Sequence, residues 1–325
     1  MERVPFGRTG VRVSRMCLGT MMFGRRCDEA MAERIVSTAL DHGVDFLDTA
    51  AMYADGETER ILGRILKGKR DRFFVATKVH KGLDRRSIVE SIEESLGRLA
   101  MDYVDLYLIH WPRKGMRPEE MMRGLDEVVR SGKARFVGCS NFPAWLYAHC
   151  NAIARAHGWA ELVCNQVPYN PIERGIEVEI LPQAVAEGIA ITVYRPLVMG
   201  LLTGRYHPDR PLPEDARGTG DERVRRWLAR YAGGIRFLVE LAARRGVSPL
   251  DVAIAWVRSA PGVTCPIVGV SRVEQVDEAV AAFRFELGPG ERDALSDAFG
   301  AAPTEESGGE FANLRREVNL VARGE

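Results

Sequence analysis

Short apolar runs alternate with longer amphipathic stretches from about residue 14 to residue 283. Most of the runs are about four to seven residues of mainly Val, Ile, Leu or Phe, a pattern typical of strands buried on both faces of a parallel sheet. They are SRMCLGT (14–20), DFLDTA (45–50), RFFVATK (72–78), YVDLYLIH (103–110), ARFVGCS (134–140), ELVCNQ (161–166), IAITVYR (189–195) and VTCPIVG (263–269).

The stretches between these runs carry helical periodicity and helix-boundary residues. Asp28 is a predicted N-cap, and Gly43 stands where that helix should end. Ser87 and Glu90 match a capping box, and Pro118 suits the first turn of a later helix. Further helical patterns occupy roughly residues 57–68, 143–156, 177–187, 235–259 and 272–282.

Eight strands that alternate with about eight helices form either a closed barrel or a doubly wound sheet. The 325-residue length fits a (β/α)₈ TIM barrel with insertions, and no linker divides the chain, so we expect one domain over residues 1–325. A doubly wound nucleotide domain normally has a glycine fingerprint after its first strand. The nearest candidates, GTGDER at 218 and GPGERD at 288, lack the third glycine and follow no strand.

Three segments lie outside the repeat. Residues 1–13 read as a hairpin before the first strand, placed to plug the bottom of the barrel. Residues 205–233 are rich in Pro, Gly, Asp and Arg and are predicted to be a long loop on the cofactor side. Residues 300–325 form a C-terminal tail that we expect to fold over one end.

Charge and cysteine content favour a small-molecule partner in a reducing compartment. Forty-five basic residues balance 45 acidic ones, so no net field attracts nucleic acid or an acidic membrane. The N-terminus has no signal-peptide pattern, and no run of 18 apolar residues suggests a membrane span. The six cysteines show no CxxC spacing. We therefore expect a cytoplasmic protein without disulfides; its oligomeric state stays open.

Polar residues end most of the apolar runs, at the strand ends where a barrel carries its active site. Tyr53 follows Asp48 by five residues, in the loop that leaves the second strand. Singly, each residue has a structural explanation, such as a turn, a helix cap or a solvated side chain; together they predict one shared polar site. The strand-end residues are Thr20, Asp48, Lys78, His110, Ser140, Asn141, Gln166 and Tyr194.

Four of these side chains have a common chemical logic in carbonyl reduction. A tyrosine with its ordinary pKa near 10 gives up its proton reluctantly, and a neighbouring ammonium lowers that pKa. Tyr53 and Lys78 supply this pair, and the Asp48 carboxylate is suited to hold the ammonium in place. His110 is suited to hydrogen-bond the carbonyl oxygen and orient it.

The motifs around these residues resemble those of the aldo-keto reductase family. GVDFLDTAAMYADGETERILGRIL is similar to the family signature around its catalytic Asp and Tyr, VATKV to the segment with its Lys, and DLYLIHWP to the one with its His. The likeness covers roughly residues 3–283 in the same order. It continues through FVGCSNFP, CNQVPYN, YRPLVMGLLTGRY and PIVGVSRVEQVDEA.

The resemblance implies that NAD(P)H lies across the barrel mouth. Tyr194 matches the ring that stacks on the nicotinamide, and Arg272 is placed to pair with a 2′-phosphate, so NADP(H) is preferred and NAD(H) possible. Arg195 replaces the commoner serine and is suited to offer charge to the pyrophosphate. Ala279 replaces a common asparagine, which puts one adenine contact in doubt. The matched cofactor residues are Thr20, Met21, Ser140, Asn141, Gln166, Tyr194, Arg195, Leu197, Gly200, Arg205, Gly269, Ser271, Arg272, Gln275 and Glu278.

Other functional classes fit less well. A short-chain dehydrogenase needs a lysine four residues after a tyrosine, and none of the eight tyrosines has one. A metal-dependent barrel hydrolase needs clustered ligands, but neither HxH nor HExxH occurs, so no metal site is predicted. A nucleotide-binding regulatory subunit or redox sensor on the same barrel remains an alternative. Five apolar or aromatic residues flank the predicted site. They either form the walls of a substrate pocket or, equally, are ordinary packing residues: Met21, Met22, Phe23, Met52 and Trp111.

Overall fold

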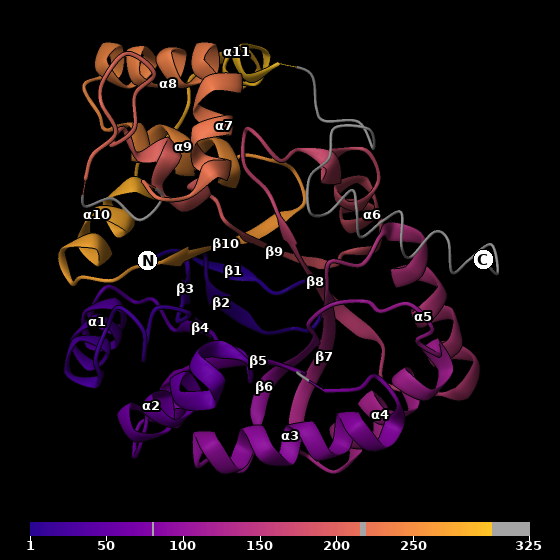
Figure 1. The fold of residues 1–325 in the computed structure, drawn as a ribbon. Coiled ribbons are helices and arrows are strands. Elements are labelled where there is room, and N and C mark those ends of the chain that lie inside the picture. The colour runs from indigo at the N-terminus through magenta and orange to yellow at the C-terminus, as the bar shows by residue number, and fades with distance from the viewer. Residues whose placement is uncertain (80, 215–218, 301–325) are drawn as a thin grey trace.

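The computed structural model describes residues 1–79, 81–214 and 219–300. Eight parallel strands close into a barrel with helices around it, which confirms the predicted (β/α)₈ TIM barrel (Figure 1). All eight apolar runs became strands of this barrel, in chain order with the last strand beside the first. They are β3 (Cys17–Gly19), β4 (Phe46–Asp48), β5 (Phe74–Val79), β6 (Val104–Ile109), β7 (Ala134–Ser140), β8 (Leu162–Pro168), β9 (Ala190–Tyr194) and β10 (Val263–Gly269).

The predicted N-terminal hairpin is confirmed and closes one end of the barrel. Strands β1 (Arg3–Pro5) and β2 (Arg12–Ser14) pair antiparallel. Between them, buried Phe6 contacts Phe46 and Phe74, with ring centroids 5.8 and 5.1 Å away. Because Phe46 and Phe74 are the first residues of β4 and β5, this aromatic cluster fills the N-terminal end. The opposite end of the barrel is therefore left for a site.

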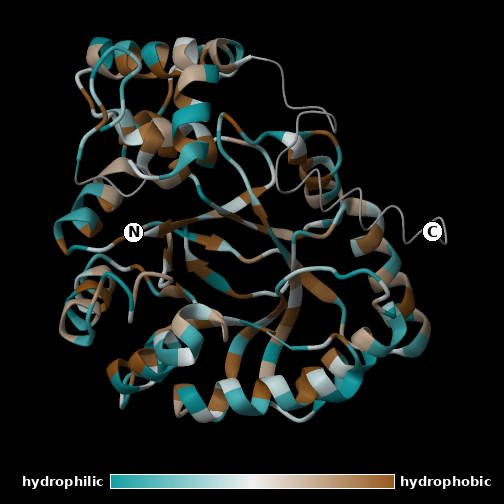
Figure 2. Ribbon diagram, viewed as in Figure 1, coloured by the Kyte–Doolittle hydropathy of each residue, from teal (hydrophilic) through white to brown (hydrophobic). Residues whose placement is uncertain are grey.

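Helices surround the strands and bury their apolar faces against them, and the helices carry both brown and teal positions in Figure 2. They are α1 (Glu29–Asp41), α2 (Glu57–Ile65), α3 (Arg85–Leu99), α4 (Pro118–Arg130), α5 (Ala144–His157), α6 (Ile180–Glu187), α7 (Glu222–Arg230), α8 (Ala232–Arg245), α9 (Pro249–Arg258), α10 (Glu274–Ala282) and α11 (Glu291–Phe299). Short 3₁₀ helices are η1 (Tyr53–Gly56), η2 (Arg70–Arg72), η3 (Gly175–Glu177) and η4 (Val198–Thr203).

Three of the four helix-boundary predictions are confirmed. The Asp28 carboxylate accepts from the Met31 amide at 2.8 Å, α1 ends at Asp41 with left-handed Gly43 (φ 75°) just beyond it, and Pro118 is the first residue of α4. The capping box at Ser87 and Glu90 was wrong. Helix α3 begins at Arg85 because the Asp84 carboxylate accepts from both the amide and the hydroxyl of Ser87. Ser87 therefore lies inside the first turn.

Two other expectations are corrected. The pattern over 235–259 is two helices, α8 and α9, because Ser248 and Asp251 form a capping box and Pro249 starts a new helix. The segment 205–233, expected to be a loop, contains α7, whose N-cap is Asp221. The tail after Gly300 lies outside the described residues.

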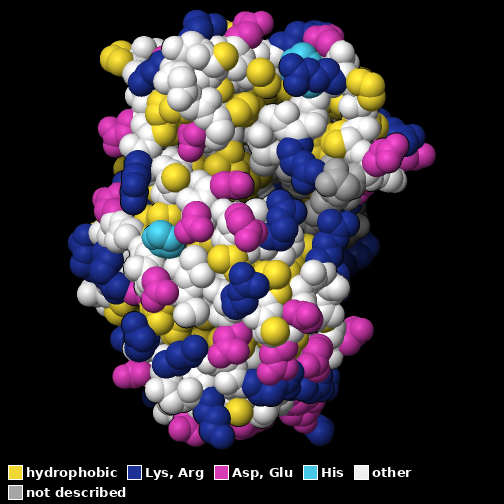
Figure 3. Space-filling model, turned by 90° about the vertical axis from the view of Figure 1, so that its left-hand side faces the viewer, with side chains coloured by type: hydrophobic (Ala, Val, Ile, Leu, Met, Phe, Trp, Pro, Cys, Tyr) yellow, Lys and Arg dark blue, Asp and Glu magenta, His cyan; other side chains and the backbone are white. Residues whose placement is uncertain are grey.

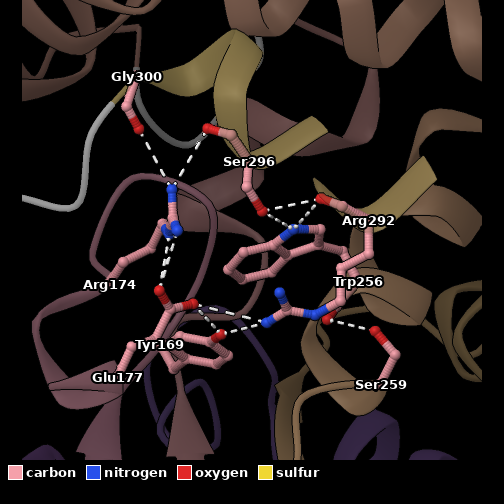
Figure 4. Close-up of polar contacts among 8 residues, drawn as sticks. All are labelled: Tyr169, Arg174, Glu177, Trp256, Ser259, Arg292, Ser296 and Gly300. Atoms are coloured by element: carbon pink, nitrogen blue, oxygen red, sulfur yellow. Dashed lines mark hydrogen bonds and ion pairs between the residues drawn. The ribbon is translucent and has the colours of Figure 1, made fainter. Parts of the chain in front are cut away.

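Helix α11 is anchored to the loop that follows β8 (Figure 4). Arg292 donates to the hydroxyl of Tyr169 at 2.7 Å, and that hydroxyl donates to Glu177 at 2.5 Å. Arg174 pairs with Glu177 and also donates to the carbonyl of Gly300 at 3.2 Å. Helix α11 is thus held beside the site end of β8.

The surface is mixed in charge, and acidic and basic side chains are interspersed on the face shown in Figure 3. Among the described residues, no helix combines the length and apolar composition needed to cross a bilayer. In the same residues, no group of three or more His, Cys, Asp or Glu side chains is placed to hold a metal ion. All six cysteines are free and buried.

Candidate active site

A buried ion pair lies at the C-terminal ends of β4 and β5. The Lys78 ammonium donates to both oxygens of Asp48 and to the carbonyl of Thr49, each at 2.7 Å. Its distance to the hydroxyl of Tyr53 is 3.5 Å. Lys78 is fully buried and Asp48 is 3% exposed. An ammonium removed from water needs such partners, and here Asp48 neutralises it.

The backbone after β4 carries Tyr53 to this pair. The Tyr53 amide donates to the carbonyl of Ala50 at 3.0 Å, which starts the turn η1. Ala54, Asp55 and Gly56 then have φ values of 46°, 52° and 85°. Three consecutive left-handed residues reverse the chain into α2, and only Gly56 adopts this conformation without strain. The tyrosine therefore stands on a turn that the surrounding structure must hold.

Burial decides the protonation of Tyr53. It raises the pKa of Tyr53 above its ordinary value of 10, although the nearby Lys78 charge lowers that pKa, as we expected, and partly offsets the effect. Burial also works against the charge of Lys78, but Asp48 and Tyr53 outweigh it and raise the pKa of Lys78. At neutral pH the site holds a neutral tyrosine beside an ammonium.

His110 completes the predicted set of four. It follows β6, is half-buried, and its ring centroid lies 6.1 Å from that of Tyr53 in an edge-on arrangement. The neighbouring Trp111 ring is nearly parallel to it, with centroids 6.3 Å apart. The side-chain amide of Asn141 donates to the His110 carbonyl at 3.2 Å. The structure thus brings Asp48, Tyr53, Lys78 and His110 together.

A chain of hydrogen bonds extends from Asp48 across β7, β8 and β9. Gln166 donates to Asp48 at 2.8 Å, and Ser140 donates to the Gln166 carbonyl at 2.7 Å. Asn141 donates to the Ser140 hydroxyl at 3.0 Å and accepts from the hydroxyl of Tyr194 at 2.8 Å. The four residues predicted to bind nicotinamide therefore form one shelf joined to the ion pair.

Residues after β3 divide between the site and the core. Thr20 is buried and donates to the carbonyl of Asp48 at 2.9 Å, and Met21 is half-buried beside it. Met22 and Phe23 pack in the hydrophobic core, so for these two the alternative of ordinary packing is correct. Met52 is 43% exposed.

The segment after β9 has an unusual backbone. Arg195, Val198, Met199 and Gly200 have φ values of 56°, 49°, 55° and 93°. Left-handed residues within a turn direct successive amide groups to one side and make concave anion sites. Within this segment Leu197 is half-buried, and beyond it Arg205 is exposed.

Arg195 is held by the loop after β8. Its guanidinium pairs with Glu173 at 2.7 Å, and its carbonyl accepts from the side chain of Asn170 at 3.1 Å. Asn170 is fully buried and also donates to Glu173 at 2.9 Å. The arginine predicted to face a pyrophosphate therefore has a carboxylate partner of its own.

The end of β10, the turn that follows it and α10 carry the remaining predicted cofactor residues. The side-chain oxygen of Gln275 accepts from the amides of Ser271 and Arg272 at 2.8 and 3.2 Å, which fixes this turn. Arg272 and Glu278 are exposed on α10 or just before it, and Gly269 is exposed at the end of β10. Gly269, Ser271 and Arg272 end or directly follow β10 and so lie at the same end of the barrel as the ion pair, whereas Glu278 lies in the middle of α10.

The chain matches the model of the aldo/keto reductase family over residues 15–298. It belongs to the aldo/keto reductase family. The oxidoreductase YrpG of Bacillus subtilis, itself uncharacterized, is 34% identical over an alignment of 307 residues that covers 88% of this chain and 92% of that protein. The versiconal hemiacetal acetate reductase of Aspergillus parasiticus is 30% identical, with 92% and 97% covered. A probable voltage-gated potassium channel subunit beta of Arabidopsis thaliana is 31% identical, with 87% and 91% covered.

Membership of the aldo/keto reductase family implies NAD(P)H-dependent oxidoreduction of carbonyl compounds. Sequence reasoning about this aldo/keto reductase missed the direct contact of Gln166 with Asp48 and the contact of Glu173 with Arg195. It also missed Glu59, a fully buried carboxylate on α2. One signal was available for Glu59, because a carboxylate within the apolar stripe of an amphipathic helix has to find a buried partner.

Proposed function

We propose that this protein reduces an aldehyde or ketone to an alcohol, reversibly, with NADPH as the hydride donor. The observation that carries the proposal is the contact of Lys78 with Asp48 and Tyr53 at a strand end beside His110. The donor set suits the cofactor. The shelf offers amide and hydroxyl groups for a carboxamide and an aromatic ring for a nicotinamide, and the left-handed segment 195–200 suits a pyrophosphate.

NADPH supplies the hydride when bound, and the protein handles the proton. Tyr53 donates its proton to the carbonyl oxygen as general acid, which its raised pKa keeps available at neutral pH. The Lys78 ammonium stabilises the tyrosinate that is left, and Asp48 keeps that ammonium charged and in place. His110 hydrogen-bonds the carbonyl and orients it.

The proposed cofactor contacts combine the family resemblance with the position of each residue. Ser140, Asn141 and Gln166 would hold the carboxamide, and the Tyr194 ring, with Thr20 and Met21 beside it, would support the nicotinamide. Leu197, Gly200 and Arg205 line the pyrophosphate segment with Arg195. Gly269, Ser271, Gln275 and Glu278 hold the adenosine, and Arg272 pairs with the 2′-phosphate, which favours NADP(H) over NAD(H). The partner of the site is a small carbonyl or alcohol molecule.

The test is oxidation of NADPH with a panel of aldehydes and ketones. We expect turnover with some member of the panel. Tyr53→Phe should abolish turnover, because it removes the proton donor, while the dissociation constant of NADPH, measured by fluorescence, changes less than about threefold. Turnover that survives in Tyr53→Phe would assign the proton to another group.

A regulatory role on the same barrel is the second candidate, favoured by the relative named as a potassium channel subunit beta. It predicts NADPH binding without turnover on any carbonyl of the panel. The complete set of four side chains supports the enzyme instead, because a binding protein needs no proton donor aligned with a buried ammonium.

A further inference from the structure

Glu59 on α2 is a buried charge that the proposed chemistry does not use. Its side chain is fully buried. One carboxylate oxygen accepts from the hydroxyl of Thr77 at 2.6 Å, and the other accepts from the Nε of Arg98 at 2.6 Å. Arg98 also donates to the hydroxyl of Ser95 at 3.2 Å. A carboxylate placed away from water without such partners would be costly, so this arrangement is specific.

The Glu59–Arg98 pair lies directly under the turn that carries Tyr53. A Cβ atom added at Gly56 would lie 2.6 Å from the Cδ of Arg98 and 3.0 Å from its Nε. The arginine stem therefore fills the space against the backbone of Gly56, the last residue of η1. From the other side, the buried hydroxyl of Thr58 donates to the carbonyl of Phe23 at 2.8 Å.

The same pair reaches the strand that bears the lysine. Thr77 and Lys78 are neighbours on β5, and neighbouring side chains of a strand point to opposite faces. Lys78 points into the barrel toward Asp48, whereas Thr77 points outward to Glu59. One carboxylate thus connects the start of α2, which follows Tyr53, to the strand that positions Lys78.

The turn needs such support because it is strained. Ala54 and Asp55 each hold a left-handed conformation, which is unfavourable for a residue with a Cβ. Strained backbone persists only where neighbouring contacts over-determine it. We infer that Glu59 and Arg98 are positioning residues that hold this turn, and with it the hydroxyl of Tyr53, within reach of Lys78. This inference rests on the proposed role of Tyr53 as proton donor.

The test is Glu59→Gln, which keeps the shape of the side chain but turns one acceptor into a donor. With the full-length enzyme we expect kcat for carbonyl reduction to fall at least tenfold, with KM and the dissociation constant of NADPH within twofold of wild type. Amides of residues 51–58 should exchange hydrogen for deuterium faster, and this readout needs no turnover.

Asp105→Asn is the matched control. Asp105 is 2% exposed and, like Glu59, is a buried carboxylate held by arginine, in its case by Arg70 at 2.6 Å and Arg135 at 2.7 Å. It lies at the start of β6, at the opposite end of the barrel. If loss of a buried ion pair acted only through stability, this variant would lower kcat as much as Glu59→Gln. We expect its kcat to stay within twofold of wild type.

Milder variants cover the case in which Glu59→Gln does not fold. Arg98→Lys should retain more kcat than Arg98→Met, because it keeps the charge, and Thr77→Val should give an intermediate loss. Folded variants with unchanged kcat and unchanged exchange at 51–58 would overturn the inference, as would an equal loss in Asp105→Asn. Tyr53→Phe, assayed beside these variants, separates the two proposals. If Tyr53→Phe retains wild-type kcat, the proposed function fails. Hydrogen exchange of residues 51–58 in Glu59→Gln tests the positioning role independently of turnover.

Discussion

Lys78 and Asp48 form a fully satisfied ion pair inside the barrel, with both carboxylate oxygens 2.7 Å from one ammonium. Gln166 donates to the same carboxylate at 2.8 Å, so the pair joins the predicted proton donor to the predicted nicotinamide shelf. The Asp48 carboxylate therefore contacts both the lysine beside the predicted proton donor and a residue predicted to bind the cofactor. A substitution at Asp48 should therefore affect both proton transfer and cofactor binding.

Asp48→Asn should lower both stability and activity. Removing one partner leaves the other charge buried without compensation, so we expect the free energy of unfolding to fall by about 3 kcal/mol. The pKa of Lys78 should fall too, because Asp48 is among the groups that raise it. With less positive charge near Tyr53, kcat should fall at least about 100-fold. Urea denaturation and steady-state rates measure the two effects.

The control for this change is Glu127→Gln on α4. Glu127 pairs with Arg85 at 2.6 Å, but both side chains are at least 40% exposed. Exposed pairs contribute little because water screens them. The unfolding free energy should stay within error, and a loss equal to that of Asp48→Asn would mean that burial does not set the cost.

The raised pKa of Tyr53 predicts an alkaline limit for carbonyl reduction. The proton donor stays protonated up to its folded-state pKa, so the rate should hold through about pH 10 and fall above it. Stability has the same sign: the protonated form is favoured in the folded state, and that contribution is present below about pH 10 and is lost as the pH rises through the folded pKa.

A difference titration checks this directly in the free protein. Tyrosinate absorbance of wild type minus that of Tyr53→Phe isolates one group. Its midpoint should lie above 10. A midpoint below 9 would show that the Lys78 charge outweighs burial, contrary to the balance of causes found here.

The sequence predicted the barrel well because its strands are buried on both faces and its helices on one, which leaves two distinct periodicities. It also predicted the four side chains, since parallel strands in a barrel end on one rim. Local sequence patterns did not predict individual hydrogen bonds between residues that lie far apart in the chain. Gln166 and Asp48 are 118 positions apart, and nothing local marks their pairing. The net pKa shift of Tyr53 depends on burial that only the packed barrel defines.

Glu173→Gln should tighten NADPH binding. In the free protein Glu173 holds the Arg195 guanidinium at 2.7 Å, beside the left-handed segment suited to a pyrophosphate. Neutralising this carboxylate removes one negative charge that competes with the phosphates for the arginine, and a lower dissociation constant by about threefold fits the value of a partly exposed pair. Arg195→Ser should weaken binding and flatten its salt dependence. If Glu173→Gln weakens binding as much as Arg195→Ser, the pair only shapes the turn.

Arg272→Ala should change cofactor preference without touching the chemistry. Arg272 is exposed, and its backbone amide donates to the side chain of Gln275 at 3.2 Å. Truncating the Arg272 side chain therefore leaves this backbone hydrogen bond in place. If it pairs with the 2′-phosphate, its loss should raise the dissociation constant of NADPH about tenfold, while that of NADH stays within twofold. Arg284→Ala, after the end of α10, serves as the control for general charge loss. Equal weakening of NADPH and NADH would place Arg272 on a group that both cofactors share.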